Sequence, residues 1–264
     1  MAAVNPRRSQ RARAWLRLGF TAAMLLTLAA VISTYYRGAL LAGAAMLFAL
    51  WIKSRNRTMV AAMIVAVVLV GLPFLPQKWF DRMQTIETYQ QDASAQGRLK
   101  MWKFAFCLAR RYPITSGGFN SQEAYYLYPA CRVDLPKVKA YHSNYFEVLG
   151  EHGFIGLFLY LAIGLAALLT ASGIIRRTRD RPELAWSRDL AAMLQVSLIG
   201  YAVGGMFLNK AYFDLYWHLV AIIVVTCGVV MRTLAESPKT GDRPAVMASS
   251  APGRAGLDQP QQTG

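Results

Sequence analysis

Three residues have side chains and positions suited to a reaction at a membrane surface. Arg37 separates two apolar blocks, Arg98 follows Gly97 in a long polar segment, and His142 precedes another apolar block. Guanidinium groups stay charged and bind phosphate oxygens in pairs, and an imidazole with a pKa of about 6.5 accepts protons near neutral pH. These residue types suit stabilisation of a departing diphosphate and removal of a proton from a hydroxyl, without a metal ion.

Each of these residues also has a structural interpretation. Arg37 could anchor a helix end at the lipid interface, with its charge reaching toward water. Arg98 could be an ordinary solvated arginine, and His142 could cap or pack a helix start. Both interpretations of each residue stay open from the sequence.

Secondary candidates lie near the starts of two predicted helices. Asp214 and His218 are four residues apart and share one helix face, so they either form a hydrogen-bonded pair or contribute to an acceptor site. Glu147 and Glu151 have the same spacing. We expect these two carboxylates to favour the helix start through its dipole more than to perform acid chemistry.

The cysteines allow a disulfide, and no motif indicates a cofactor. Cys107 and Cys131 fall in the polar segment, and Cys227 lies in an apolar block. An oxidising compartment would favour a bond between the first two, with two unpaired thiols as the alternative. No zinc spacing, P-loop, GxGxxG or GxSxG occurs, so we expect neither a metal ion nor another cofactor.

The elements that must position these residues are membrane-spanning helices. The 264-residue chain is 55% hydrophobic and 16% charged, whereas soluble domains carry about 25% charged residues. Its charges are missing from whole blocks, which are long enough, alone or as return spans, to cross a hydrocarbon core of about 30 Å. The predicted spans cover about residues 14–33, 38–52, 59–75, 154–175, 190–208 and 212–231.

The distribution of charge predicts the topology. The net charge of +15 does not indicate nucleic-acid binding, because the basic residues cluster at the ends of apolar blocks rather than in one stripe. Placing both termini in the cytoplasm puts these clusters on one side, as the positive-inside rule requires. We therefore predict an all-α polytopic membrane helix bundle of about six transmembrane helices, with one large extracytoplasmic loop between spans three and four.

The predicted segments follow from these boundaries. They are a basic cytoplasmic N-terminus over 1–13, transmembrane helices 1–3 over 14–75, an extracytoplasmic (periplasmic) loop over 76–147, transmembrane helices 4–6 over 148–231, and a disordered cytoplasmic tail over 232–264. Within the loop, Gly97–Arg111 is predicted to be a helix with Leu99, Trp102, Phe106 and Ala109 on one face. This basic amphipathic helix would lie on membrane lipids or pack on the rest of the loop.

Several motifs resemble those of a known superfamily. The Arg37-Gly38-Ala39 turn, Gly97-Arg98-Leu99 and His142-Ser143-Asn144-Tyr145 resemble the arginine turn, loop motif and histidine motif of the O-antigen ligase and polymerase superfamily. Over about residues 31–231 the chain is most similar to the O-glycosylation ligases associated with exosortase A systems. The strings that carry this closer resemblance are Gln77–Met83, Asp92–Ala95, Phe146–Gly153 and Ala211–Tyr216.

The resemblance implies an enzyme of the bacterial cytoplasmic (inner) membrane. It would move a glycan from a polyprenyl diphosphate carrier to a hydroxyl acceptor, on a protein or a lipid, at the extracytoplasmic face and without a metal. By motif match, Arg37 and Arg98 would hold the diphosphate, and His142 would be the base or position the acceptor.

Two alternatives accompany this interpretation. The first is a polysaccharide polymerase of the same superfamily, and the second is a non-catalytic or truncated membrane subunit. Members of the resembled family usually have further N-terminal spans. We therefore expect a separate N-terminal half as a partner, a truncated gene or a misassigned start.

Overall fold

The structure is a computed structural model that describes residues 6–34, 36–54, 56–71, 93–135 and 137–236. No strand occurs among these residues, and the predicted all-α membrane helix bundle is confirmed. The α-helices are α1 (Pro6–Ser33), α2 (Arg37–Lys53), α3 (Arg57–Gly71), α5 (Ala93–Arg111), α6 (Asn144–Arg177), α7 (Ala185–Gly204) and α8 (Asp214–Glu236). Short 3-10 helices are η2 (Ser121–Glu123), η3 (Tyr125–Leu127), η4 (Pro129–Cys131) and η5 (Pro182–Leu184).

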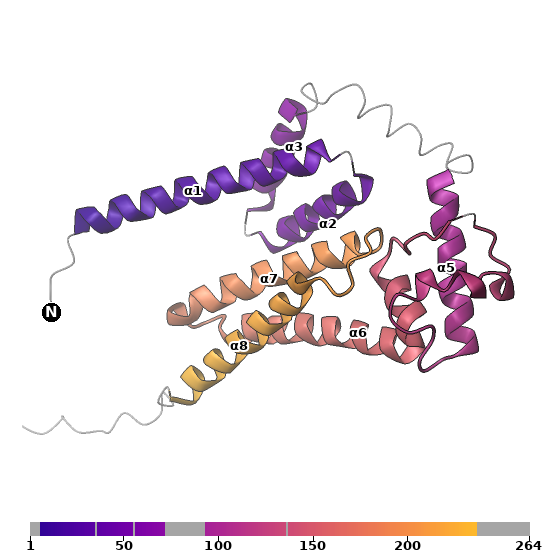
Figure 1. Cartoon of the computed structure of the whole chain (residues 1–264). Helices are drawn as coiled ribbons and strands as arrows, with labels where there is room; N and C mark the ends of the chain where they lie inside the picture. The colour runs from indigo at the N-terminus through magenta and orange to yellow at the C-terminus, as the bar shows by residue number, and fades with distance from the viewer. Residues whose placement is uncertain (1–5, 35, 55, 72–92, 136, 237–264) are drawn as a thin grey trace, which may run out of the picture.

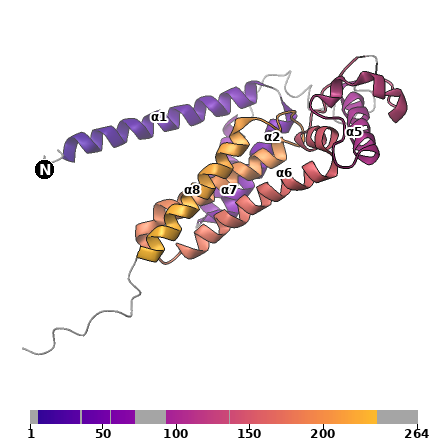
Figure 2. The ribbon, with the colours of Figure 1, turned by 60° about the horizontal axis from the view of Figure 1, so that its bottom comes forward.

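Helices α6, α7 and α8 lie side by side, α2 packs along α7, and the α5 region covers one end of α6 (Figures 1 and 2). Glycines on α7 allow α2 to approach closely, because Gly200 lies against Met46 and Gly204 against Ala42. The outward faces are apolar, with Phe158 68% and Val225 65% exposed. Such faces suit a lipid environment rather than water.

Three helices among the described residues are long and apolar enough to cross a membrane. They are α1 over Ala14–Val31, α6 and α8, while Gly38–Lys53 and Arg57–Ala66 are shorter apolar helices. The chain is therefore a multi-pass membrane protein. That about six helices cross the bilayer stays a prediction.

Several helices extend beyond the predicted spans. α1 begins inside the predicted N-terminal segment 1–13, α6 begins inside the predicted loop, and α8 continues past the predicted tail start at 232. Backbone hydrogen bonds continue into polar turns, so an apolar block marks the lipid-facing part of a helix rather than its ends. The predicted end of span three, the string Gln77–Met83 and the tail beyond 236 lie outside the described residues.

A break in α6 fixes the α5 region to the bundle. Gly153 has φ 66° and ψ −163°, a conformation adopted almost only by glycine, and the Pro113 carbonyl oxygen occupies the place of a Cβ there. The break frees main-chain groups that would otherwise bond within the helix. The Gly117 amide donates to the Gly150 carbonyl at 3.0 Å, and the Phe154 amide donates to the Pro113 carbonyl at 3.0 Å.

The buried face of α5 differs from the predicted apolar face. The buried residues of this cluster are Met101, Phe104, Ala105 and Leu108, joined by Tyr128, Val133 and Tyr141. Of the predicted face, Leu99 and Phe106 are exposed whereas Ala109 is buried, so the predicted face only partly overlaps the packing face. Helix α5 carries apolar residues on more than one side, and spacing alone could not identify the side that packs.

A disulfide joins α5 to η4. The Cys107 and Cys131 sulfurs are 2.04 Å apart, and Cys227 is a partly buried free thiol in α8. The bond closes a segment of 24 residues that includes η2 and η3. It therefore restrains the short 3-10 helices against the helix that carries Arg98.

Candidate functional site

His142 is positioned by buried residues on both sides of it. The Tyr141 hydroxyl lies 2.7 Å from the Ser121 Oγ, and the Tyr141 carbonyl accepts a hydrogen bond from the Trp102 indole at 2.8 Å. Ser143 is buried at the N-cap of α6 with an extended backbone. Between them His142 has φ 53°, a left-handed conformation that histidine adopts more readily than most residues, and its side chain is exposed.

Two cations lie close to His142. Arg98 is half-buried in α5, and the Lys139 side chain lies over Gly97, where any larger residue would displace it. Partial burial lowers the pKa of His142, and the positive charges of Arg98 and Lys139 lower this pKa further. The imidazole is therefore neutral at neutral pH and able to accept a proton.

The start of α2 lies at the same end of the bundle. The Tyr36 hydroxyl donates a hydrogen bond to the Phe207 carbonyl, and Gly38 packs against the Phe207 side chain. Burial raises the pKa of Tyr36, and the nearby Arg98 charge partly offsets this rise in the pKa. The positive charge of Arg98 thus lowers the pKa of both Tyr36 and His142.

The structure brings two of the three predicted residues together. Arg98 and His142 lie in one electrostatic cluster with Lys139. Arg37 is the first residue of α2, directly after Tyr36, and its side chain lies outside the described residues. The functional roles assigned to the three residues stay predictions.

Sequence reasoning assigned no role of their own to Lys139, Tyr36 or Asn144, although Asn144 belongs to the histidine motif. Lys139 lies three residues before His142, and Tyr36 directly precedes Arg37, so proximity in sequence was the available signal. Neither position carries a pattern that separates it from other loop lysines or interfacial tyrosines. Their importance follows from contacts with distant segments.

Asn144 ties the start of α6 to the connection between α7 and α8. It is 1% exposed, and its main-chain N–H donates a hydrogen bond to the Gly205 carbonyl at 2.7 Å. Its side-chain oxygen accepts a hydrogen bond from the Lys210 amide at 2.7 Å. These bonds hold the residue next to the N-cap Ser143, and hence the His142 backbone, against the bundle.

Two buried carboxylates continue this contact along α6. Glu147 accepts hydrogen bonds from the Asn209 side chain and the Ala211 amide, both at 3.0 Å. Glu151 accepts a hydrogen bond from the Tyr212 hydroxyl at 2.5 Å. The expectation that these carboxylates act mainly on the helix dipole misses these tertiary bonds, because the partners lie some sixty residues further along the chain.

The pair at the start of α8 is bonded locally. The His218 Nδ1 lies 2.7 Å from the main-chain oxygen of Asp214, so the ring pairs with the backbone rather than with the Asp214 carboxylate. Both side chains are exposed. Their acceptor-site role stays a prediction, and Glu147 stays a secondary candidate. No group of three or more His, Cys, Asp or Glu in the described part of the chain could hold a metal ion.

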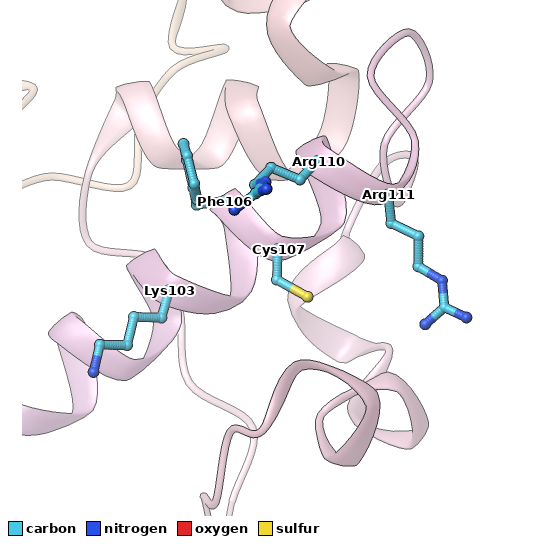
Figure 3. Close-up of a pocket in the computed structure, with 5 residues that line it drawn as sticks. All are labelled: Lys103, Phe106, Cys107, Arg110 and Arg111. Atoms are coloured by element: carbon cyan, nitrogen blue, oxygen red, sulfur yellow. The ribbon is translucent and has the colours of Figure 1, made fainter.

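Two hollows lie near these elements. One of about 630 Å³ runs between α6, α7 and α8, and leucines and the tyrosines Tyr145, Tyr160, Tyr201 and Tyr216 contribute to its lining. The other, of about 430 Å³, lies on α5 further along the helix than Arg98 (Figure 3). Its lining residues are Lys103, Phe106, Cys107, Arg110 and Arg111.

Comparison with known proteins identifies a family. The family model described as O-antigen ligase matches residues 22–161, which is more than half of the chain. The matched range contains the start of α2, Arg98 and His142, and it ends within α6. No curated protein and no solved structure matches the chain.

Proposed function

This chain belongs to the O-antigen ligase family, and from that premise we propose that it transfers a glycan from a polyprenyl diphosphate carrier to a hydroxyl acceptor. The transfer takes place at the extracytoplasmic face of the bacterial cytoplasmic membrane. The observation that carries the proposal is the position of His142 beside Arg98, whose charge helps to lower the pKa of the imidazole, near the start of α2.

Arg98 binds the diphosphate of the donor. A guanidinium donates paired hydrogen bonds to phosphate oxygens, and it compensates the charge that develops as the bond between the sugar and the diphosphate breaks. Arg37 contributes a second guanidinium from the start of α2. Lys139 supports this role, because its positive charge, like that of Arg98, lowers the pKa of His142.

His142 accepts the proton of the acceptor hydroxyl. The lowered pKa keeps the imidazole unprotonated before the donor binds. The negative diphosphate then offsets the two cations and makes the protonated imidazole more stable during transfer. The acceptor oxygen forms a bond to the anomeric carbon, and the diphosphate leaves on its polyprenyl chain.

The 630 Å³ hollow between α6, α7 and α8 is consistent with a lipid-linked donor. Most of its surface is contributed by apolar side chains, including Phe158, Leu161, Leu165 and Leu169. An isoprenoid chain is also apolar and gains free energy on leaving water for such a surface. The hollow thus suits the polyprenyl chain of the donor.

The test compares variants in a host that lacks its own ligase. We expect Arg98→Gln and His142→Asn to lose transfer at least a hundredfold while reaching wild-type membrane levels. Asparagine suits position 142 because it tolerates the left-handed backbone. Glycan on the acceptor is the readout, and Lys137→Gln, an exposed loop variant, is the control.

A binding measurement separates the two roles. Arg98→Gln should weaken the binding of a polyprenyl diphosphate to the purified chain, whereas His142→Asn should leave it within a few-fold of wild type. Transfer by both variants at the wild-type rate would show that the site is elsewhere.

A further inference from the structure

The outer face of α5 combines cationic side chains with bulky apolar ones. Leu99, Lys103, Phe106 and Arg110 recur at spacings of three and four residues, so they share one face, and all four are exposed. This face lies opposite the buried residues around Leu108. Helix α5 contains no acidic residue, so its cations are not neutralised from within the helix.

This face is continuous with the apolar surface of the bundle. The Phe106 ring meets the edge of the Phe154 ring with centroids 6.0 Å apart. Phe154 directly follows the break at Gly153 and begins the apolar part of α6, where Ile155 and Phe158 are exposed as well. Phe106 therefore lies where the exposed apolar surface of α6 ends, which is where we expect the lipid headgroups to lie.

Cations line the hollow on both sides of Phe106 along the helix. Figure 3 shows Arg110 beside Phe106, whereas Lys103 and Arg111 extend from α5 in opposite directions. An exposed aromatic ring beside several cations is typical of a surface that lies in the interface, with the ring in the acyl boundary and the charges among anionic headgroups.

We propose that the outer face of α5 binds the headgroups of anionic phospholipids. Arg110 and Lys103, which share the exposed face with Phe106, contact the phosphates of neighbouring headgroups, and Phe106 enters the acyl boundary beside Phe154. The occupant is a lipid rather than a soluble anion, because these cations share a helix face with an aromatic ring that continues the apolar surface of α6. The inference rests on membrane insertion and is independent of the glycan transfer proposed above.

The experiment measures binding to the full chain purified in detergent. The thermal unfolding midpoint is followed through tryptophan fluorescence while phosphatidylglycerol, phosphatidylcholine or inorganic phosphate is added. We expect phosphatidylglycerol to raise the midpoint more than the other two additives do. Lys103→Gln/Arg110→Gln should weaken this apparent affinity on the order of tenfold, and high salt should weaken it in the wild type.

The control removes two other exposed charges from the same region. Arg132→Gln/Lys137→Gln should bind phosphatidylglycerol as the wild type does. A charge-retaining variant, Lys103→Arg/Arg110→Lys, should also bind normally and separates loss of charge from loss of folding.

Three results would overturn the proposal. They are equal effects of phosphatidylglycerol and phosphatidylcholine, equal losses in the two charge-removing variants, or an equal effect of inorganic phosphate. The last result would indicate a soluble anion site instead.

Discussion

The chemistry proposed for His142 depends on the charges placed around one imidazole. A histidine surrounded by cations is a weaker base in the free enzyme than an isolated one, but it stays unprotonated over a wider range of pH. The anionic donor reverses part of this effect when it binds. Residue types at this site therefore act jointly, and the charge of each affects the protonation of the others.

Replacing Lys139 with glutamine tests this coupling. Because burial, Arg98 and Lys139 all lower the pKa of His142, the acid limb of the wild-type rate profile should lie below the ordinary histidine pKa of about 6.5. Lys139→Gln removes one source of repulsion for the imidazolium. The pKa should rise, and the acid limb should move to higher pH.

The measurement is the initial transfer rate as a function of pH. Lys137→Gln removes a lysine of the same loop that is exposed, and its profile should match the wild type. An acid limb that stays in place or moves to lower pH in Lys139→Gln would contradict the assigned interaction.

Among the elements, the break in α6 determines how the polar region meets the bundle. Gly153 permits a main-chain conformation that turns the first helical turns of α6 out of line with the rest. The main-chain groups freed at the break then bond to the segment after α5. A continuous helix would satisfy those groups internally and would leave the α5 region without this attachment.

Replacing Gly153 with alanine should therefore be costly. A Cβ there would meet the Pro113 carbonyl oxygen, and the backbone conformation is strained for alanine. We expect a loss of roughly 1–3 kcal/mol in the free energy of unfolding, measured by denaturation in detergent. Gly173→Ala, on the same helix with open space around it, should be neutral or stabilising, and equal losses in the two variants would refute the role of the break.

The disulfide is the second element-level constraint. Cys107→Ala/Cys131→Ala should lower the free energy of unfolding by about 2–4 kcal/mol, because the open segment gains conformational entropy in the unfolded chain. Reducing agent should lower the unfolding midpoint of the wild type but not that of the variant. Cys227→Ala is the control, and it should leave the response to reducing agent unchanged.

For the whole molecule, the arrangement of ends predicts the topology. The part of α6 after the break at Gly153, residues 154–177, has 24 residues and so extends roughly 36 Å, which is enough to cross a hydrocarbon core of about 30 Å. The Arg98–His142 cluster lies near one end of this helix, and the basic connection to α7, with Arg179 in it and Arg176 and Arg188 beside it, lies at the other. The positive-inside rule places the basic connection in the cytoplasm.

Cysteine labelling in intact cells checks this orientation. In a Cys227→Ser background, Lys137→Cys should react with a membrane-impermeant maleimide added from outside. Arg179→Cys should react only after permeabilisation. The reverse pattern would place His142 in the cytoplasm and would rule out transfer at the extracytoplasmic face.

The sequence alone was enough to predict the class of molecule and the residue types of the candidate site. Charge-free blocks identify membrane helices because the cost of placing charge in hydrocarbon acts on each segment separately. Arg98 and His142 were selectable because they occur in short motifs beside predicted helix starts. Both signals are local along the chain.

The tertiary structure alone decided which segments meet. It shows that Glu147 and Glu151 bond to the α7–α8 connection, that Met101 and Leu108 rather than Leu99 and Phe106 form the packing face of α5, and that Lys139 acts on His142. The physical reason is that these interactions join residues brought together by helix packing. Several arrangements of the helices would bury the same apolar residues, so hydrophobic periodicity does not select among them. The hydrogen bonds and charge interactions between distant segments exist only in the arrangement that the structure shows.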